Sequence, residues 1–205
     1  MTTDGIHERL KAVFGDDVGP LSEAKMDAFA LVKKERIVEV CRFLKTEPGL
    51  ELEFLEDETA VDWPKRNVIE IVYHLLSYRH RHGIVLKVEL DRAAPVITTV
   101  ETVWKTANWF EREIYDLFGV DFTGHPDLRR LLLPDDWVGH PLRKDYQDAG
   151  GWHGISSFRE NPLVELRRLD EVRRAEAAKL NPPPPPSPPP AAPPAAGPAV
   201  PPAKA

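Results

Sequence analysis

The sequence contains a single cysteine, Cys41, in 205 residues. A disulfide framework within the chain is therefore excluded, and so is an iron–sulfur cluster held only by the chain's own thiolates. Sparse cysteine suits a reducing compartment. Cys41 shares one face of a predicted helix with Ile37, Val40 and Leu44, so we expect it to be a buried core residue rather than a reactive thiol.

Long hydrophobic runs are also missing. The most apolar stretch, residues 68–76, is interrupted by Glu70 and His74 and is far shorter than the roughly 20 residues that cross a bilayer. The amino terminus has neither a basic region nor an apolar core, so no signal peptide is expected. Any link to a membrane would then run through a partner.

Excess positive charge and catalytic motifs are absent as well. The formal net charge is −6, which argues against a binder of nucleic acid or anionic membranes that works by bulk charge. We find no nucleophile elbow, P-loop, glycine-rich dinucleotide fingerprint, HExxH or CxxC motif. Residue types used in acid–base or metal chemistry do gather late in the chain, but without a known ligand spacing: Glu111, Glu113, Asp116, His125, Asp127, Asp135, Asp136 and His140. An autonomous active site is therefore not favoured.

What is present predicts an α+β domain over residues 1–122. Apolar periodicity predicts helices at 6–14 and 35–45 and strands at 27–32, 50–54, 68–76, 84–90 and 120–122. Thr98 and Glu101 have the spacing of a capping box, which predicts a helix from there to Phe118, with Gly119 after its end. On that helix Arg112 and Asp116 are spaced to form an ion pair.

The loop that joins the strands at 68–76 and 84–90 into a predicted hairpin is basic and contains His80 and His82. Two histidines at this spacing in a strand can chelate a metal. No acidic or thiol residue stands beside them in the sequence, so a solvated loop is the favoured interpretation.

Residues 123–160 differ in character, and we call them the extended arm. Two Gly-His-Pro phrases, at 124–126 and 139–141, favour non-helical backbone because proline restricts the residue before it. A charged helix is expected over 161–180, with Asn161 as its N-cap, and a disordered proline-rich tail over 181–205. We interpret the tail as a spacer, with a proline-rich ligand for an aromatic groove as the alternative.

The extended arm also carries residue types that suit a protein interface. Arg129, Arg130 and Arg143 can form bidentate pairs with carboxylates. Trp137 and Tyr146 are of the types that anchor interfaces. The residues alone leave two readings open, since the same side chains could hold the arm on a partner or on this chain's own sheet.

Two blocks carry a family resemblance. The first runs from Glu111 to Arg130 and includes Glu-Arg-Glu, Asp-Leu-Phe-Gly-Val and Gly-His-Pro-Asp-Leu-Arg-Arg; the second is Gly-His-Pro-Leu-Arg-Lys-Asp-Tyr, residues 139–146. Together they resemble the signature of the C subunit of NADH-quinone oxidoreductase, respiratory complex I, and the similarity covers roughly residues 43–146. The alternative is a homologous subunit of a membrane-bound hydrogenase-like complex or of a complex with another electron donor.

The resemblance implies a two-layer α+β fold with a mixed, roughly five-stranded sheet and flanking helices. It implies a non-catalytic, peripheral subunit on the cytoplasmic side of the bacterial inner membrane, bound to the D subunit, which we call the quinone-site subunit. This chain would hold no cofactor, with FMN and iron–sulfur clusters in neighbouring partner subunits passing electrons from NADH to quinone. Glu111, Arg112 and Asp116 would fix the helix, and the two Gly-His-Pro blocks would carry the arm across the quinone-site subunit. The implied signature and interface residues are Glu111, Arg112, Glu113, Asp116, His125, Asp127, Arg129, Arg130, Trp137, His140, Arg143, Lys144, Asp145 and Tyr146.

Overall fold

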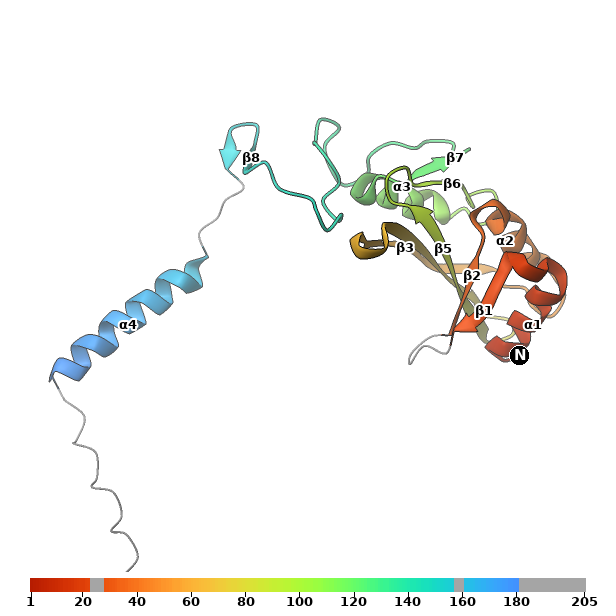
Figure 1. The fold of residues 1–205 in the computed structure, drawn as a ribbon, viewed down its shortest axis with the longest axis horizontal. Helices are drawn as coiled ribbons and strands as arrows, with labels where there is room; N and C mark the ends of the chain where they lie inside the picture. The colour runs from red at the N-terminus through yellow and green to blue at the C-terminus, as the bar shows by residue number, and fades with distance from the viewer. Residues whose placement is uncertain (23–27, 157–160, 181–205) are drawn as a thin grey trace, which may run out of the picture. The chain divides into compact units, whose positions relative to one another are not determined.

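Figure 1 shows the computed structural model of the chain, which describes residues 1–22, 28–156 and 161–180. The chain divides into two units, Met1–Ala149 and Gly150–Ala205, and each is described by itself. The helices of the first unit are α1 (Thr3–Phe14), α2 (Ile37–Thr46) and α3 (Ala107–Phe118), with short 3-10 turns η1 (Gly15–Asp17), η2 (Lys34–Arg36) and η3 (Pro64–Arg66). Its strands are β1 (Val18–Ser22), β2 (Phe29–Val32), β3 (Phe54–Trp63), β4 (Val68–Ser77), β5 (His82–Asp91), β6 (Val96–Thr98) and β7 (Asp121–Thr123).

A mixed five-stranded sheet organises the first unit, in the order β1-β2-β5-β4-β3. β2 and β5 run parallel, and the other neighbours are antiparallel. The predicted hairpin is confirmed, because β4 and β5 pair from Val68 opposite Asp91 to Ser77 opposite His82. The predicted α+β class with a mixed sheet is confirmed as well, although β1 and all of β3 after Phe54 were not foreseen.

The core lies on one face of this sheet. Side chains alternate across a strand, and on β4 the inward set includes Ile69, Ile71 and Tyr73, all fully buried. The buried faces of α1, α2 and α3 join the same apolar cluster, so the helices form the second layer. On the opposite face Glu70 and Lys87 form an ion pair, with 2.8 Å between the carboxylate oxygen and Nζ.

The predicted start of the third helix is wrong. Thr98 ends strand β6, which pairs in parallel with β7, and α3 begins only at Ala107. The hydroxyl of Thr99 instead accepts the N–H of Glu101 at 3.0 Å in a local turn. Pairing with a strand about 25 residues later thus overrides a short-range capping pattern. The predicted end is confirmed, with Gly119 in the left-handed region after Phe118.

The predicted strand over residues 50–54 is also wrong, although its alternation correctly marks buried side chains. Leu50 and Leu52 are fully buried, but Glu51 has φ +40° and β3 starts at Phe54. The carbonyl of Leu50 accepts a hydrogen bond from His82 Nε2 at 2.8 Å. His82 is therefore a buried core histidine at the start of β5, which corrects the solvated-loop interpretation for this residue.

The second unit contains a two-stranded hairpin and a helix. The hairpin joins β8 (Gly151–Trp152) to β9 (Ile155–Ser156), and the expected charged helix corresponds to α4 (Pro162–Leu180). Asn161 Oδ1 accepts the N–H of Leu163 at 3.0 Å, as the sequence predicts for an N-cap. The proline-rich tail predicted over 181–205 lies outside the described residues.

The expected burial of Cys41 is confirmed, and it generates the first prediction. The side chain is fully buried, and burial raises the pKa of its thiol. Because only the thiolate reacts readily, Cys41 in the native chain should resist iodoacetamide and become labelled only after unfolding in denaturant. Rapid stoichiometric alkylation of the native chain, followed by mass spectrometry, would contradict this placement.

Candidate functional site

Asp116 of α3 fixes the path of the extended arm within the first unit, and from here on the extended arm means residues 124–149. Its side chain is completely buried and accepts four donors, the backbone N–H groups of Leu131 (3.1 Å), Leu132 (2.8 Å) and Leu133 (2.9 Å) and Nη1 of Arg130 (2.7 Å). Burial alone raises the pKa of a carboxyl group, but here the donors outweigh it and the pKa of Asp116 lies below its usual value. The carboxylate is therefore ionised and holds three consecutive residues of the arm.

Arg112 and Arg130 complete this attachment. Arg112 is buried, and its guanidinium donates at 3.2 Å to the carbonyl oxygens of Arg129 and Arg130. Arg130 in turn donates to the carbonyl of Trp137 at 2.9 Å. The ion pair predicted between Arg112 and Asp116 is wrong, because each of the two side chains binds the arm instead of the other.

The second Gly-His-Pro block is fastened to the end of α3. His140 Nδ1 lies 2.9 Å from the carbonyl oxygen of Asp116, and the N–H of Leu142 donates to the carbonyl of Leu117 at 3.1 Å. A Cβ atom on Gly119 would stand 2.5 Å from His140 Nε2. Gly119 therefore serves two needs, a left-handed φ of +73° and room for the histidine ring.

The end of the same block is tied to the sheet through Asp62 and Arg92. Arg92 forms a bidentate pair with the buried carboxylate of Asp62, at 2.6 and 3.0 Å, and also donates to Asp145 at 2.5 Å. The backbone N–H of Lys144 donates to Asp62 at 2.8 Å. Hydrogen bonding to Arg92 lowers the pKa of Asp62. Arg143 donates to the carbonyl of Phe118 at 2.6 Å, so it too acts within the chain.

Glu111 occupies a different environment from Asp116. Its carboxylate is buried and accepts the hydroxyl of Thr99, at 2.5 Å, and the N–H of Val100, at 2.7 Å. Desolvation raises the pKa of Glu111 to about 7, although these hydrogen bonds act in the opposite direction. His125 Nε2 lies 3.9 Å from the carboxylate and 3.2 Å from the carbonyl of Asn108. Glu111 thus anchors the turn before α3 rather than the arm.

The remaining predicted site residues lie nearer the surface. Glu113, Asp127, Arg129 and Lys144 are exposed, and Asp127 pairs with Arg129 at 2.9 Å. Trp137 and Tyr146 are half-buried, and the Tyr146 ring lies against Gly139. Most of the predicted site residues therefore bind other parts of this chain, and only a smaller group is exposed.

Sequence reasoning missed Asp62, Arg92 and Thr99 as parts of this site. A signal existed for Asp62, because it shares the inward parity of Ala60 on β3, and an acidic residue at such a position needs a partner. Arg92 follows β5, and its two carboxylate partners are 30 and 53 residues away in the chain. No local pattern reveals such distant pairs.

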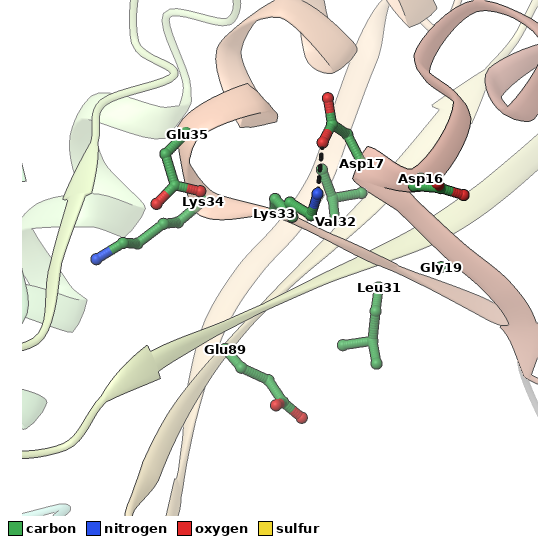
Figure 2. A pocket seen from close by; sticks show the side chains of 9 residues that line it. All are labelled: Asp16, Asp17, Gly19, Leu31, Val32, Lys33, Lys34, Glu35 and Glu89. Atoms are coloured by element: carbon green, nitrogen blue, oxygen red, sulfur yellow. Dashed lines mark hydrogen bonds and ion pairs between the residues drawn. The ribbon is translucent and has the colours of Figure 1, made fainter.

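A separate hollow of about 400 Å³ lies beside β1 and β2, and Figure 2 shows its lining. Lys33 pairs with Asp17 across it at 2.7 Å, and Asp16, Lys34, Glu35 and Glu89 contribute further charges of both signs. The described residues that line it include no cysteine, serine or threonine to act as a nucleophile, and no histidine to act as a base. Within the described ranges, no three His, Cys, Asp or Glu side chains gather as metal ligands do.

Fold and site together define a class of protein, an α+β domain whose extended arm is held on its own helix and sheet. In the described part of the chain, no helix has both the length and the apolar character to cross a membrane. The family described as respiratory-chain NADH dehydrogenase, 30 Kd subunit, matches residues 30–151.

Individual relatives agree with this match. The chain is 46% identical over 139 residues to the C subunit of NADH-quinone oxidoreductase from Roseiflexus sp., covering 67% of this chain and 80% of the relative. It is 44% identical over 144 residues to the C subunit from Geobacter sulfurreducens, covering 69% and 88%. The chain belongs to the respiratory-chain NADH dehydrogenase 30 Kd subunit family, and it is thus a subunit of a multi-subunit NADH-quinone oxidoreductase, complex I.

Solved structures show the same fold. A trypsin-resistant fragment of Nqo5 aligns with a TM-score of 0.50 and 25% identity, covering 60% of this chain and 98% of the fragment. A chain of the membrane-bound sulfane sulfur reductase, an archaeal respiratory membrane complex, aligns with a TM-score of 0.58 and 24% identity, covering 80% and 89%. At this identity the second likeness concerns the fold alone.

Asp116 gives a prediction about stability. Asp116→Asn keeps the shape but replaces an anionic acceptor with an amide whose N–H₂ faces backbone donors. The free energy of unfolding should therefore fall by about 3–5 kcal/mol. Asp127→Asn is the matched control, since Asp127 is exposed and its carboxylate pairs with the exposed Arg129, and it should leave the free energy of unfolding nearly unchanged. Urea unfolding of both variants measures this, and equal effects would refute the buried attachment.

Glu111 gives a prediction about pH. The unfolded carboxyl ionises near 4.5, whereas the folded one holds its proton up to about pH 7. In this window the folded chain binds more protons, so the free energy of unfolding should fall as the pH rises, by up to about 3 kcal/mol from this group. Glu111→Gln should remove the part of this decrease in the free energy of unfolding that Glu111 contributes. Identical slopes for wild type and variant in urea unfolding between pH 4.5 and 7 would contradict it.

Proposed function

We propose that this chain is a non-catalytic subunit of the peripheral arm of proton-translocating NADH:quinone oxidoreductase, and that it docks on the quinone-site subunit. In this role it supports assembly of the quinone-reducing module. Electrons pass from NADH through FMN and iron–sulfur clusters of partner subunits to quinone, on the cytoplasmic side of the bacterial inner membrane. The chain's only thiol lies buried in the core, which supports a role without a thiolate-bound redox group of its own.

The observation that carries this proposal is the shape of the extended arm. Residues 124–149 contain no helix or strand, yet Asp116, Arg112 and Arg92 bind their backbone or side chains from the folded domain. A segment fixed in this way loses little conformational entropy when a partner binds. The arm is thus a preorganised surface for a partner.

Apolar side chains on the outer surface of the arm supply contact area. Val138 is 84% exposed and Leu132 is 62% exposed, although both lie in a segment held in place by internal hydrogen bonds. The arm's charged signature residues mostly act within the chain. We therefore assign partner contact to the exposed apolar positions together with Arg129 and Lys144.

The direct test is recovery of the complex. A tagged chain, expressed in its native host in place of the untagged one, should co-purify from detergent-solubilised membranes with the quinone-site subunit and the flavin- and cluster-bearing NADH dehydrogenase subunits. Mass spectrometry identifies them. Recovery of hydrogenase-like partners without an NADH-binding subunit would contradict the proposed electron donor, and absence of the quinone-site subunit would contradict the proposed docking.

The exposed apolar surface predicts an assembly defect without a folding defect. Val138→Asp should reduce recovery of the quinone-site subunit several-fold, because it places a charge in an apolar contact. The isolated chain should keep its melting temperature, since exposed positions tolerate substitution. Val13→Asp is the matched control, an exposed valine on α1 outside the arm, and it should alter neither quantity. Normal recovery with Val138→Asp would show that this surface does not meet the quinone-site subunit.

A further inference from the structure

A small pocket lies between β3, the edge strand of the sheet, and α3, with Leu142 of the arm completing its wall. Its volume is about 80 Å³. That is room for about two or three water molecules at roughly 30 Å³ each, and far below the roughly 300–1,000 Å³ of small-molecule sites. The space suits the end of one side chain rather than a cofactor or substrate.

Glu58 of β3 lines this pocket and is left without a partner. It is 3% exposed, and neither carboxylate oxygen has a hydrogen-bond donor within the described part of the chain. Its side chain lies on the inward face of β3, over which α3 packs, because Glu58 is paired with the buried Tyr73 of β4. A buried carboxyl without donors is costly. The position therefore lacks a group that the described part of this chain does not supply.

The surroundings of Glu58 indicate the charge of the missing group. The hydroxyl of Tyr73 is also buried without a partner among the described residues. The groups whose charges raise the pKa of Glu58 and of Tyr73 include Cys41, Glu111 and Asp57, and none of these three is a cation. At the pocket itself, Asp57 and Glu113 are exposed and have no cationic partner in the described residues. Burial raises the pKa of Glu58, as do the neighbouring carboxylates. Each of these carboxyl groups is one that a cation would stabilise.

The walls of the pocket indicate what carries the cation. Five of the nine lining residues are apolar or aromatic and would flank a methylene stem: Phe110, Ile114, Leu117, Phe118 and Leu142. A lysine combines a four-carbon stem with a compact ammonium that has three donors, whereas an arginine presents a wider planar fork. The pocket is contiguous with the arm through Leu142, so a subunit bound to the arm could reach it.

We propose that this pocket receives a lysine side chain from the docked partner subunit, whose ammonium pairs with Glu58 while Asp57 and Glu113 flank the entrance. This inference rests on the proposed function, because it requires a partner on the arm. It adds a specific electrostatic contact to that interface. It also explains why Glu58, unlike the buried Asp62 on the same face of β3, has no partner among the described residues.

Glu58→Gln tests the proposal, since it removes the charge and keeps the shape. In the isolated chain the melting temperature at pH 8 should be unchanged or higher, because the substitution removes a buried carboxyl group that has no hydrogen-bond donors. In native membranes, the amount of quinone-site subunit retained on the tagged chain after a moderate salt wash should fall at least about tenfold. Glu56→Gln, an exposed glutamate on the same strand, should change neither quantity.

The outcomes separate this inference from the proposed function. If the wild-type chain fails to recover the quinone-site subunit, the proposed docking itself is wrong. If wild type and Glu58→Gln recover it equally, only the pocket inference fails; if the variant loses melting temperature and recovery together, Glu58 is a structural residue and the inference also fails. A cryo-EM map of the complex identifies the occupant: a partner lysine supports the proposal, and water, arginine or an apolar side chain overturns it.

Discussion

The arrangement of this subunit depends on one buried carboxylate. Asp116 has no solvent contact, so its charge must be balanced by donors inside the protein. The donors are the backbone of three successive arm residues and the guanidinium of Arg130. A helix residue thereby determines the path of a segment that has no core of its own. Arg112 on the same helix adds the complementary contact, donating to carbonyls of the arm.

The signature residues therefore have two roles, since most hold the chain together and a few remain exposed. Most of the charged signature residues form hydrogen bonds and ion pairs within the chain, and these join α3, the sheet and the extended arm. Asp62 and Arg92 do the same at the other end of the arm, next to Asp145. The surface left for a partner consists of apolar side chains such as Val138 and of the few charges that face outward. In the proposed docking, the partner recognises a shape that the internal ion pairs maintain.

The parts that could be predicted from sequence are those set by local periodicity. The hairpin of β4 and β5, the buried face around Cys41 and the stop at Gly119 follow from alternation, helical spacing and glycine's conformational freedom. The wrong start at Thr98 arose because pairing of β6 with β7 is a long-range interaction. The partners of Arg112 were missed for the same reason: its acceptors are backbone carbonyls far along the chain, at Arg129 and Arg130, which no side-chain pattern marks.

The central claim is that the chain orders its own extended arm before any partner binds. Amide hydrogen exchange of the isolated chain tests this most directly, at the N–H groups of Leu131, Leu132 and Leu133. These groups donate to a buried carboxylate, so we predict exchange far slower than in an unstructured peptide, and as slow as in α3 itself. Exchange at the rates of an unstructured peptide would contradict the account, because the arm would then become ordered only on its partner.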